Sequence, residues 1–109
     1  MPVLELSAAD SQAWLQSDLP PRLLDVREQW EWDLCRLSGA ELLPLSSFGA
    51  LAPDRLKNPA EPLLVYCHHG VRSRNVAEFL TSQGFTEVAN LSGGIDAWSR
   101  EVDPAVPRY

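Results

Sequence analysis

The 109-residue sequence has little positive charge, since it contains one lysine and eight arginines against fifteen acidic residues, and its formal net charge is −6. This balance argues against nucleic acid and anionic membranes as general partners. No apolar run approaches the roughly 18 residues of a membrane span, and the first residues lack the basic region of a signal peptide. Two cysteines do not make a disulfide framework in a chain of this length. We therefore expect a cytoplasmic protein in a reducing setting.

Length and composition indicate one globular domain. A chain of 109 residues with 45% hydrophobic and 22% charged residues can bury one core without the help of metals or disulfides. We expect a single domain over residues 1–109, with its core from about residue 3 to about residue 100. The segment from about 101 to 109 contains two prolines, which predict an extended C-terminal tail.

Short apolar runs alternate with stretches of helical periodicity about five times along the chain. Strands are predicted near residues 3–6, 23–26, 42–43, 63–66 and 86–91, with helices between them. This alternation predicts an α/β domain with a mainly parallel sheet. Ligands of such sheets bind at the carboxyl ends of the strands, and Cys67 lies at one of these ends.

Cys67 is the strongest candidate for a catalytic residue. It follows an apolar strand and precedes a short loop containing Gly70, which leads into a helix. Backbone N–H groups and the positive end of a helix dipole favour the thiolate, which is the reactive form of cysteine. Arg72 and Arg74 follow closely and would attract an anionic substrate. The predicted site comprises Cys67 as the nucleophile and, as substrate-binding residues, His68, His69, Gly70, Val71, Arg72 and Ser73.

Three segments of the chain resemble single-domain rhodaneses. Residues 67–73 resemble the active-site loop of that family, and residues 23–28 resemble its amino-terminal signature. Phe85, Val88, Leu91, Gly93-Gly94-Ile95 and Trp98 resemble its carboxyl-terminal signature. Many family members carry a Gly-His-Ile-x-Gly-Ala segment, which reads Cys35-Arg36-Leu37-Ser38-Gly39-Ala40 here, so that Arg36 replaces the histidine.

The resemblance implies a three-layer domain with a central, mainly parallel five-stranded sheet flanked by helices. It also implies a sulfurtransferase that takes a sulfane sulfur from a small anionic donor such as thiosulfate. Cys67 would hold this sulfur as a persulfide and pass it to a thiophilic acceptor, which is cyanide in an assay and a thiol or a protein in the cell. No cofactor is implied.

Two other functions fit parts of the pattern. A cysteine-dependent phosphatase or arsenate reductase uses a similar loop, but its arginine would have to occupy position 73, which is Ser73. A non-catalytic rhodanese-like binding module is the other alternative, although such modules usually lose the cysteine. Release of phosphate from an aryl phosphate without sulfur transfer would favour the phosphatase.

Several further residues have both a structural and a functional interpretation. Asp25 and Arg27 follow a predicted strand, where they either form a structural ion pair, with Arg74 as a further partner, or orient an arginine of the loop; we favour the structural pair. His68 and His69 lack the additional ligands of a closed zinc site, so no metal is predicted. Cys35 is either a second sulfur carrier or a packing residue, and packing is favoured.

Overall fold

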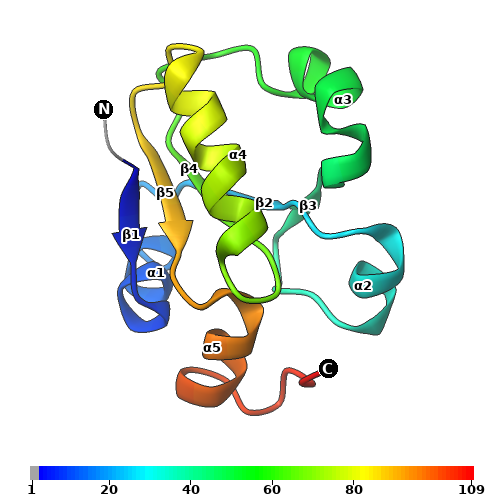
Figure 1. Ribbon diagram of the computed structural model, residues 1–109. Coiled ribbons are helices and arrows are strands. Elements are labelled where there is room, and N and C mark those ends of the chain that lie inside the picture. Colours follow the sequence, from blue (N-terminus) through cyan, green and yellow to red (C-terminus); the bar gives the residue numbers. More distant parts are fainter. Residues whose placement is uncertain (1–2) are drawn as a thin grey trace.

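The computed structural model of the protein describes residues 3–109, and its centre is a five-stranded sheet (Figure 1). The strands are β1 (Leu4–Leu6), β2 (Arg22–Asp25), β3 (Glu41–Leu42), β4 (Leu63–Tyr66) and β5 (Val88–Leu91). Their order in the sheet is β1-β5-β4-β2-β3, and every neighbouring pair is parallel. The predicted parallel α/β fold is confirmed.

Helices cover both faces of the sheet and make the three layers (Figure 1). They are α1 (Ala8–Leu15), α2 (Gln29–Leu34), α3 (Phe48–Arg55), which follows the 3-10 turn Leu45–Ser47, α4 (Val71–Ser82) and α5 (Gly94–Glu101). Residues of α3 and α4 pack in one hydrophobic cluster, whereas residues of α1 and α5 pack in another. Within residues 3–109, none of the helices combines the length and the apolar character needed to cross a membrane.

The alternation of side chains along β4 divides the core between the two faces. Val65 and Cys67 belong to the cluster under α3 and α4, while Leu64 and Tyr66 belong to the cluster over α1 and α5. Each strand residue of β4 is buried, as expected for a central strand of a parallel sheet covered on both faces. The sulfur of Cys67 consequently lies on the same side of the sheet as the first turn of α4.

The helix after Cys67 begins earlier than the sequence predicts. We expect helical periodicity from Ser73 onward, but α4 starts at Val71, directly after Gly70. Gly70 has φ +98°, a conformation that glycine adopts without the strain other residues meet, so the chain can turn into the helix at once. Arg72 and Ser73 therefore belong to the first helical turn.

The C-terminal segment is folded back rather than extended, which corrects the predicted tail. After α5 ends at Glu101, the backbone returns along the helix, where Ser99 Oγ donates to the Val106 carbonyl at 2.6 Å. Arg108 Nε donates to Asp96 at 3.1 Å. Two prolines prevent regular helix or strand here, but the polar contacts and the partial burial of Val106 give the segment a defined path.

The start of α5 is fastened to the loop that carries the cysteine. The backbone N–H of Ile95 donates to the Cys67 carbonyl at 2.9 Å, and that of Asp96 donates to the His68 carbonyl at 3.1 Å. Gly94 directly precedes these two residues and has φ +63°, and a Cβ added to it would collide with the His68 and Cys67 carbonyl groups. The close approach therefore requires glycine at this position.

We expect Gly94→Ala to destabilise the fold by about 3 kcal/mol or more, because it combines backbone overlap with an unfavourable positive φ. Gly84→Ala is the matched control, since Gly84 has φ +99° but open space around the added Cβ. The control should lose only about 1 kcal/mol in urea unfolding. Equal losses in the two variants would contradict the close packing of α5 against the loop.

Candidate active site

The sulfur of Cys67 lies in a cradle of hydrogen-bond donors at the start of α4. The backbone N–H of Gly70 donates to Sγ at 3.1 Å and that of Ser73 at 3.4 Å. Ser73 Oγ also lies 3.3 Å from Sγ. Cys67 is only 1% exposed, so these dipoles act in a poorly hydrated environment. The geometry suits a sulfur anion at the positive end of a helix dipole.

Asn90, near the carboxyl end of β5, forms hydrogen bonds with two residues of the cradle, Gly70 and Ser73. Its Nδ2 donates to the Gly70 carbonyl at 3.0 Å and to both carboxylate oxygens of Glu5 at 3.0 and 3.2 Å. Its Oδ1 lies 2.6 Å from Ser73 Oγ and accepts that hydroxyl hydrogen. Sequence analysis did not identify Asn90, although a polar residue inside an apolar strand is the signal that could have found it.

Arg72 extends sideways from the cradle and pairs with Glu31 of α2. Arg72 Nη1 donates to Glu31 Oε1 at 2.6 Å, and Nη2 donates to Oε2 at 2.8 Å. This bidentate geometry is the strongest form of a charged hydrogen bond between side chains. The guanidinium is thus fixed beside the loop while about a third of its side chain stays exposed.

Glu31 is buried, yet it remains ionised. Burial alone would favour the protonated acid, but hydrogen bonds from Arg72, Tyr109 and the Glu28 backbone outweigh it and lower the pKa of Glu31 to about 2. The Glu28 contact belongs to a capping box at the start of α2, with Glu31 Oε1 accepting from the Glu28 N–H at 3.0 Å. Sequence analysis missed Glu31, and the Glu-x-x-Glu capping spacing was the available signal.

Asp25 and Arg27 form a fully buried ion pair at the end of β2. Arg27 Nη2 donates to Asp25 Oδ2 at 2.7 Å, Nε lies 3.0 Å from Oδ1, and the Arg27 backbone N–H donates to Oδ1 at 2.9 Å. Arg27 Nη2 also donates to the Cys35 carbonyl at 2.6 Å. Asp25 therefore holds Arg27 and the turn after β2, whereas Glu31 is the carboxylate that orients a loop arginine.

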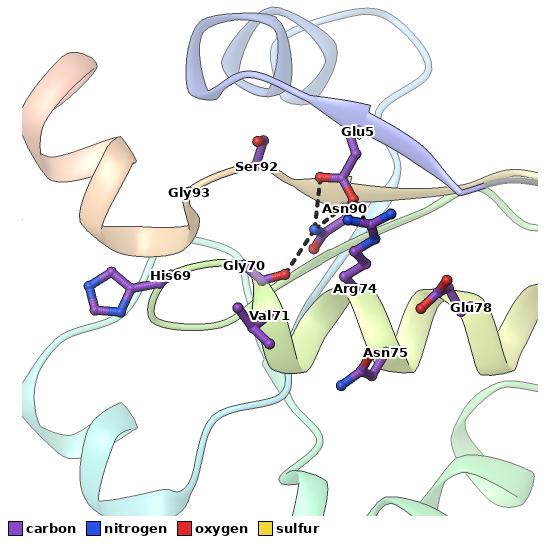
Figure 2. Close-up of a pocket in the computed structure, with 10 residues that line it drawn as sticks. All are labelled: Glu5, His69, Gly70, Val71, Arg74, Asn75, Glu78, Asn90, Ser92 and Gly93. Atoms are coloured by element: carbon purple, nitrogen blue, oxygen red, sulfur yellow. Dashed lines mark hydrogen bonds and ion pairs between the residues drawn. The ribbon is translucent and has the colours of Figure 1, made fainter.

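Arg74 points away from the cysteine, toward the edge strand β1. Its Nε lies 3.7 Å from Glu5 Oε2 rather than near Asp25, so it takes no part in the Asp25–Arg27 pair. Figure 2 shows this side of the loop, where a pocket of about 480 Å³ is lined by Glu5, Arg74, Asn90 and Gly70 among others. The Gly70 carbonyl accepts a hydrogen bond from Asn90, which lines this pocket, while the Gly70 N–H donates to Sγ on the other side of the loop. The loop backbone therefore separates the pocket from the sulfur.

The two histidines stack at the rim of the site. The rings of His68 and His69 are 3.9 Å apart with an interplanar angle of 27°, and Tyr109 covers the other side of His68 at 3.8 Å and 9°. Burial, and next the neighbouring His69, lower the pKa of His68. His69 and Val71 are exposed, with Val71 70% accessible at the mouth.

His68, His69 and Asp96 have ligand atoms within 4.8 Å of one another. A nitrogen lone pair lies in the plane of its imidazole ring, and two stacked, nearly parallel rings have no nearby point that lies in both planes, where one ion could bind both nitrogens. Asp96 also accepts hydrogen bonds from Arg100 and Arg108. A metal at this place would therefore need a change in the orientation of the imidazole rings.

Residues 7–101 match the family described as "Rhodanese-like domain". The chain belongs to this family. It is 36% identical over 109 residues to thiosulfate sulfurtransferase GlpE of Haemophilus influenzae, with all of both chains covered. It is 46% identical over 90 residues to the chloroplastic rhodanese-like/PpiC domain-containing protein 12 of Arabidopsis thaliana. That match covers 81% of this chain but only 30% of the plant protein, so the chain spans less than a third of that relative.

Solved structures show the same fold. A rhodanese-like domain protein from Staphylococcus aureus superposes with a TM-score of 0.78 at 27% identity, covering 98% of this chain and 99% of that one. A rhodanese-related protein from Thermoplasma volcanium gives a TM-score of 0.79 at 26% identity, covering 97% and 99%. The rhodanese-like three-layer architecture expected from the resemblance is confirmed.

The Glu31–Arg72 pair should leave a signature in the pH dependence of stability. Folding lowers the pKa of Glu31 from 4.5 to about 2. The ionised side chain therefore makes its full contribution to the free energy of unfolding above pH 4.5, and this contribution is lost as the pH falls toward 2. We expect Glu31→Gln to remove about 2 kcal/mol of stability near neutral pH, since solvent screens the exposed end of Arg72.

Urea unfolding at a series of pH values measures this effect. The wild type should lose more stability than Glu31→Gln on acidification, so that the two curves approach each other. Asp33→Asn is the control, because Asp33 is an exposed acidic residue of the same helix. Parallel curves for wild type and Glu31→Gln would show that the pair does not stabilise the fold.

Proposed function

We propose that this protein is a thiosulfate sulfurtransferase of the rhodanese type, which carries sulfur as a persulfide on Cys67. The observation that carries the proposal is the pair of N–H donors from Gly70 and Ser73 on a buried sulfur at the start of α4. The full-length similarity to a relative named thiosulfate sulfurtransferase supports the same choice of donor.

The reaction would proceed in two displacements at sulfur. The Cys67 thiolate attacks the outer sulfur of thiosulfate, a new S–S bond forms, and sulfite leaves with the electron pair of the broken bond. A nucleophilic acceptor then attacks the terminal sulfur and releases the Cys67 thiolate; with cyanide, the product is thiocyanate. Both steps form or consume an anion at the same point, where the N–H dipoles of the cradle stabilise it.

Arg72 would contribute to donor binding, although its ion pair with Glu31 weakens its attraction for an anion. Its charge lies beside the cradle and attracts the sulfonate oxygens of thiosulfate, but Glu31 neutralises much of it. We therefore expect thiosulfate to bind weakly. Such weak binding is compatible with a protein or a low-molecular-weight persulfide as the cellular donor. A thiol or a protein is the acceptor that we propose, without nucleic acid, membrane or cofactor.

The position of the arginine favours sulfur over phosphate as the group transferred. A phosphatase loop needs a guanidinium at position 73, whereas Ser73 is buried and bonded to Asn90. The retained cysteine in a formed cradle favours catalysis over a binding module. Since Cys35 and Cys67 are both free thiols, we propose a reducing compartment, the cytoplasm, as the place of action.

Exposure to thiosulfate should add the mass of one sulfur atom to the wild-type protein and to Cys35→Ser, but not to Cys67→Ala. Intact-protein mass spectrometry measures the gain, and addition of cyanide should remove it. Cys35→Ser is the matched control because Cys35 is the only other cysteine. A sulfur gain in Cys67→Ala, or release of phosphate from an aryl phosphate without any sulfur gain, would contradict the proposal.

We expect Arg72→Gln to raise the KM for thiosulfate by about tenfold while kcat changes less, because the arginine acts mainly on the anionic donor. This variant leaves Glu31 buried without its partner, so Arg72→Gln is compared with the double variant Arg72→Gln/Glu31→Gln, which removes both charges. Steady-state kinetics of thiocyanate formation give the two constants. An unchanged KM in both variants would show that Arg72 takes no part in binding the donor.

A further inference from the structure

Tyr109 joins the C-terminal segment to both ion pairs of the site. Its hydroxyl lies 2.9 Å from Arg27 Nη1 and 2.7 Å from Glu31 Oε2. Arg27 is always a donor, and the phenol has a single hydrogen, so Tyr109 accepts from Arg27 and donates to Glu31. Burial raises the pKa of Tyr109 and keeps this hydrogen in place.

The carboxylate of Glu31 is oriented by two anchors apart from Arg72. The Glu28 N–H fixes Oε1, and the Tyr109 hydroxyl fixes Oε2. Two anchors on the two oxygens define the plane of the carboxylate, and this plane sets the direction of the bidentate contact with Arg72. With the Tyr109 anchor removed, the carboxylate can rotate about the remaining one and take the guanidinium with it.

The ring of Tyr109 has a second set of contacts. It stacks on His68 at 3.8 Å, and Trp30 packs against it edge-on at 6.2 Å. The Arg27 guanidinium carbon lies 5.6 Å from the centroid of the Tyr109 ring, and at the same distance from that of Tyr66. The ring therefore contacts His68, Trp30 and Arg27, and it covers one face of the His68 imidazole.

We propose that Tyr109 is a positioning residue of this site, whose hydroxyl aligns Glu31 and Arg72 for the anionic donor and whose ring holds His68 at the rim. This inference rests on the proposed function for its kinetic consequence, but its geometric part concerns Arg72 and His68 alone. It assigns to the C-terminal segment a role in the site that no motif of the sequence indicates.

Tyr109→Phe separates the hydroxyl from the ring. It should raise the KM for thiosulfate by about three- to tenfold with little change in kcat, because it removes the hydrogen bonds of the hydroxyl with Glu31 and Arg27 and keeps the stacked ring. Glu101→Gln is the control, since Glu101 is an exposed charged residue at the end of α5, and it should leave both constants unchanged. Loss of folded protein would instead lower the apparent kcat and leave KM unaltered.

Alkylation of Cys67 tests the same alignment without sulfur transfer. The anionic reagent iodoacetate responds to the charge of Arg72, whereas neutral iodoacetamide does not, so the ratio of their rates reports the local field. The ratio should fall about threefold in Tyr109→Phe, toward the value in Arg72→Gln. These reactions are followed in the Cys35→Ser background, so that Cys67 is the only thiol.

NMR titration of the imidazole hydrogens tests the role of the ring. His68 faces His69, Tyr109, Glu31 and Asp96, and His69→Gln identifies its signals. The pKa of His68 should rise in Tyr109→Leu, which exposes the imidazole, and stay unchanged in Tyr109→Phe. Absence of sulfur transfer in the wild type would reject the proposed function only. The proposed role of Tyr109 would be overturned if Tyr109→Phe had the same ratio of iodoacetate to iodoacetamide rates as the wild type. It would also be overturned if the pKa of His68 did not change in Tyr109→Leu.

Discussion

The rest of the site depends on a short connection between β4 and α4 that must turn sharply while keeping N–H groups directed at one sulfur atom. Only His68, His69 and Gly70 separate Cys67 from the first helical residue. The positive φ of Gly70 makes the turn, and Asn90 and the start of α5 fix the loop carbonyls on the side away from the sulfur. Because the carbonyls are bonded there, the N–H groups of Gly70 and Ser73 are free to face Sγ.

Charge compensation around the cradle follows a consistent pattern. Arg27 is paired with Asp25, Arg72 is paired with Glu31, and the Tyr109 hydroxyl connects the two pairs. Buried arginines are costly unless their hydrogens are satisfied, so each pair stabilises a position that a single charge could not hold. The pairs leave little net side-chain charge around the sulfur. In the sulfur transfer that we propose, stabilisation of the anion would fall mainly to the backbone dipoles, which need no reorganisation during the reaction.

The fold was largely predictable from local patterns, whereas part of the site was not. The continuous apolar run 63–66 predicted β4 with correct bounds, because a central parallel strand is buried on both faces. Glu31 and Asn90 carried local signals, a capping spacing and a polar residue in an apolar strand. Tyr109 carried none, since its contact with Glu31 spans 78 positions of the chain and depends on the path of a segment without regular structure.

The register of the arginine within α4 explains why a loop of this kind suits sulfur better than a phosphoryl group. Arg72 is the second residue of the helix, and its side chain leaves the cradle sideways to reach Glu31. Ser73 takes the next position with a small hydroxyl that is already bonded to Asn90. A tetrahedral oxyanion needs a guanidinium fork over its oxygens, while one sulfur atom needs only converging N–H groups at close range. The lining of this cradle, which is backbone rather than guanidinium, therefore favours the smaller and softer anion.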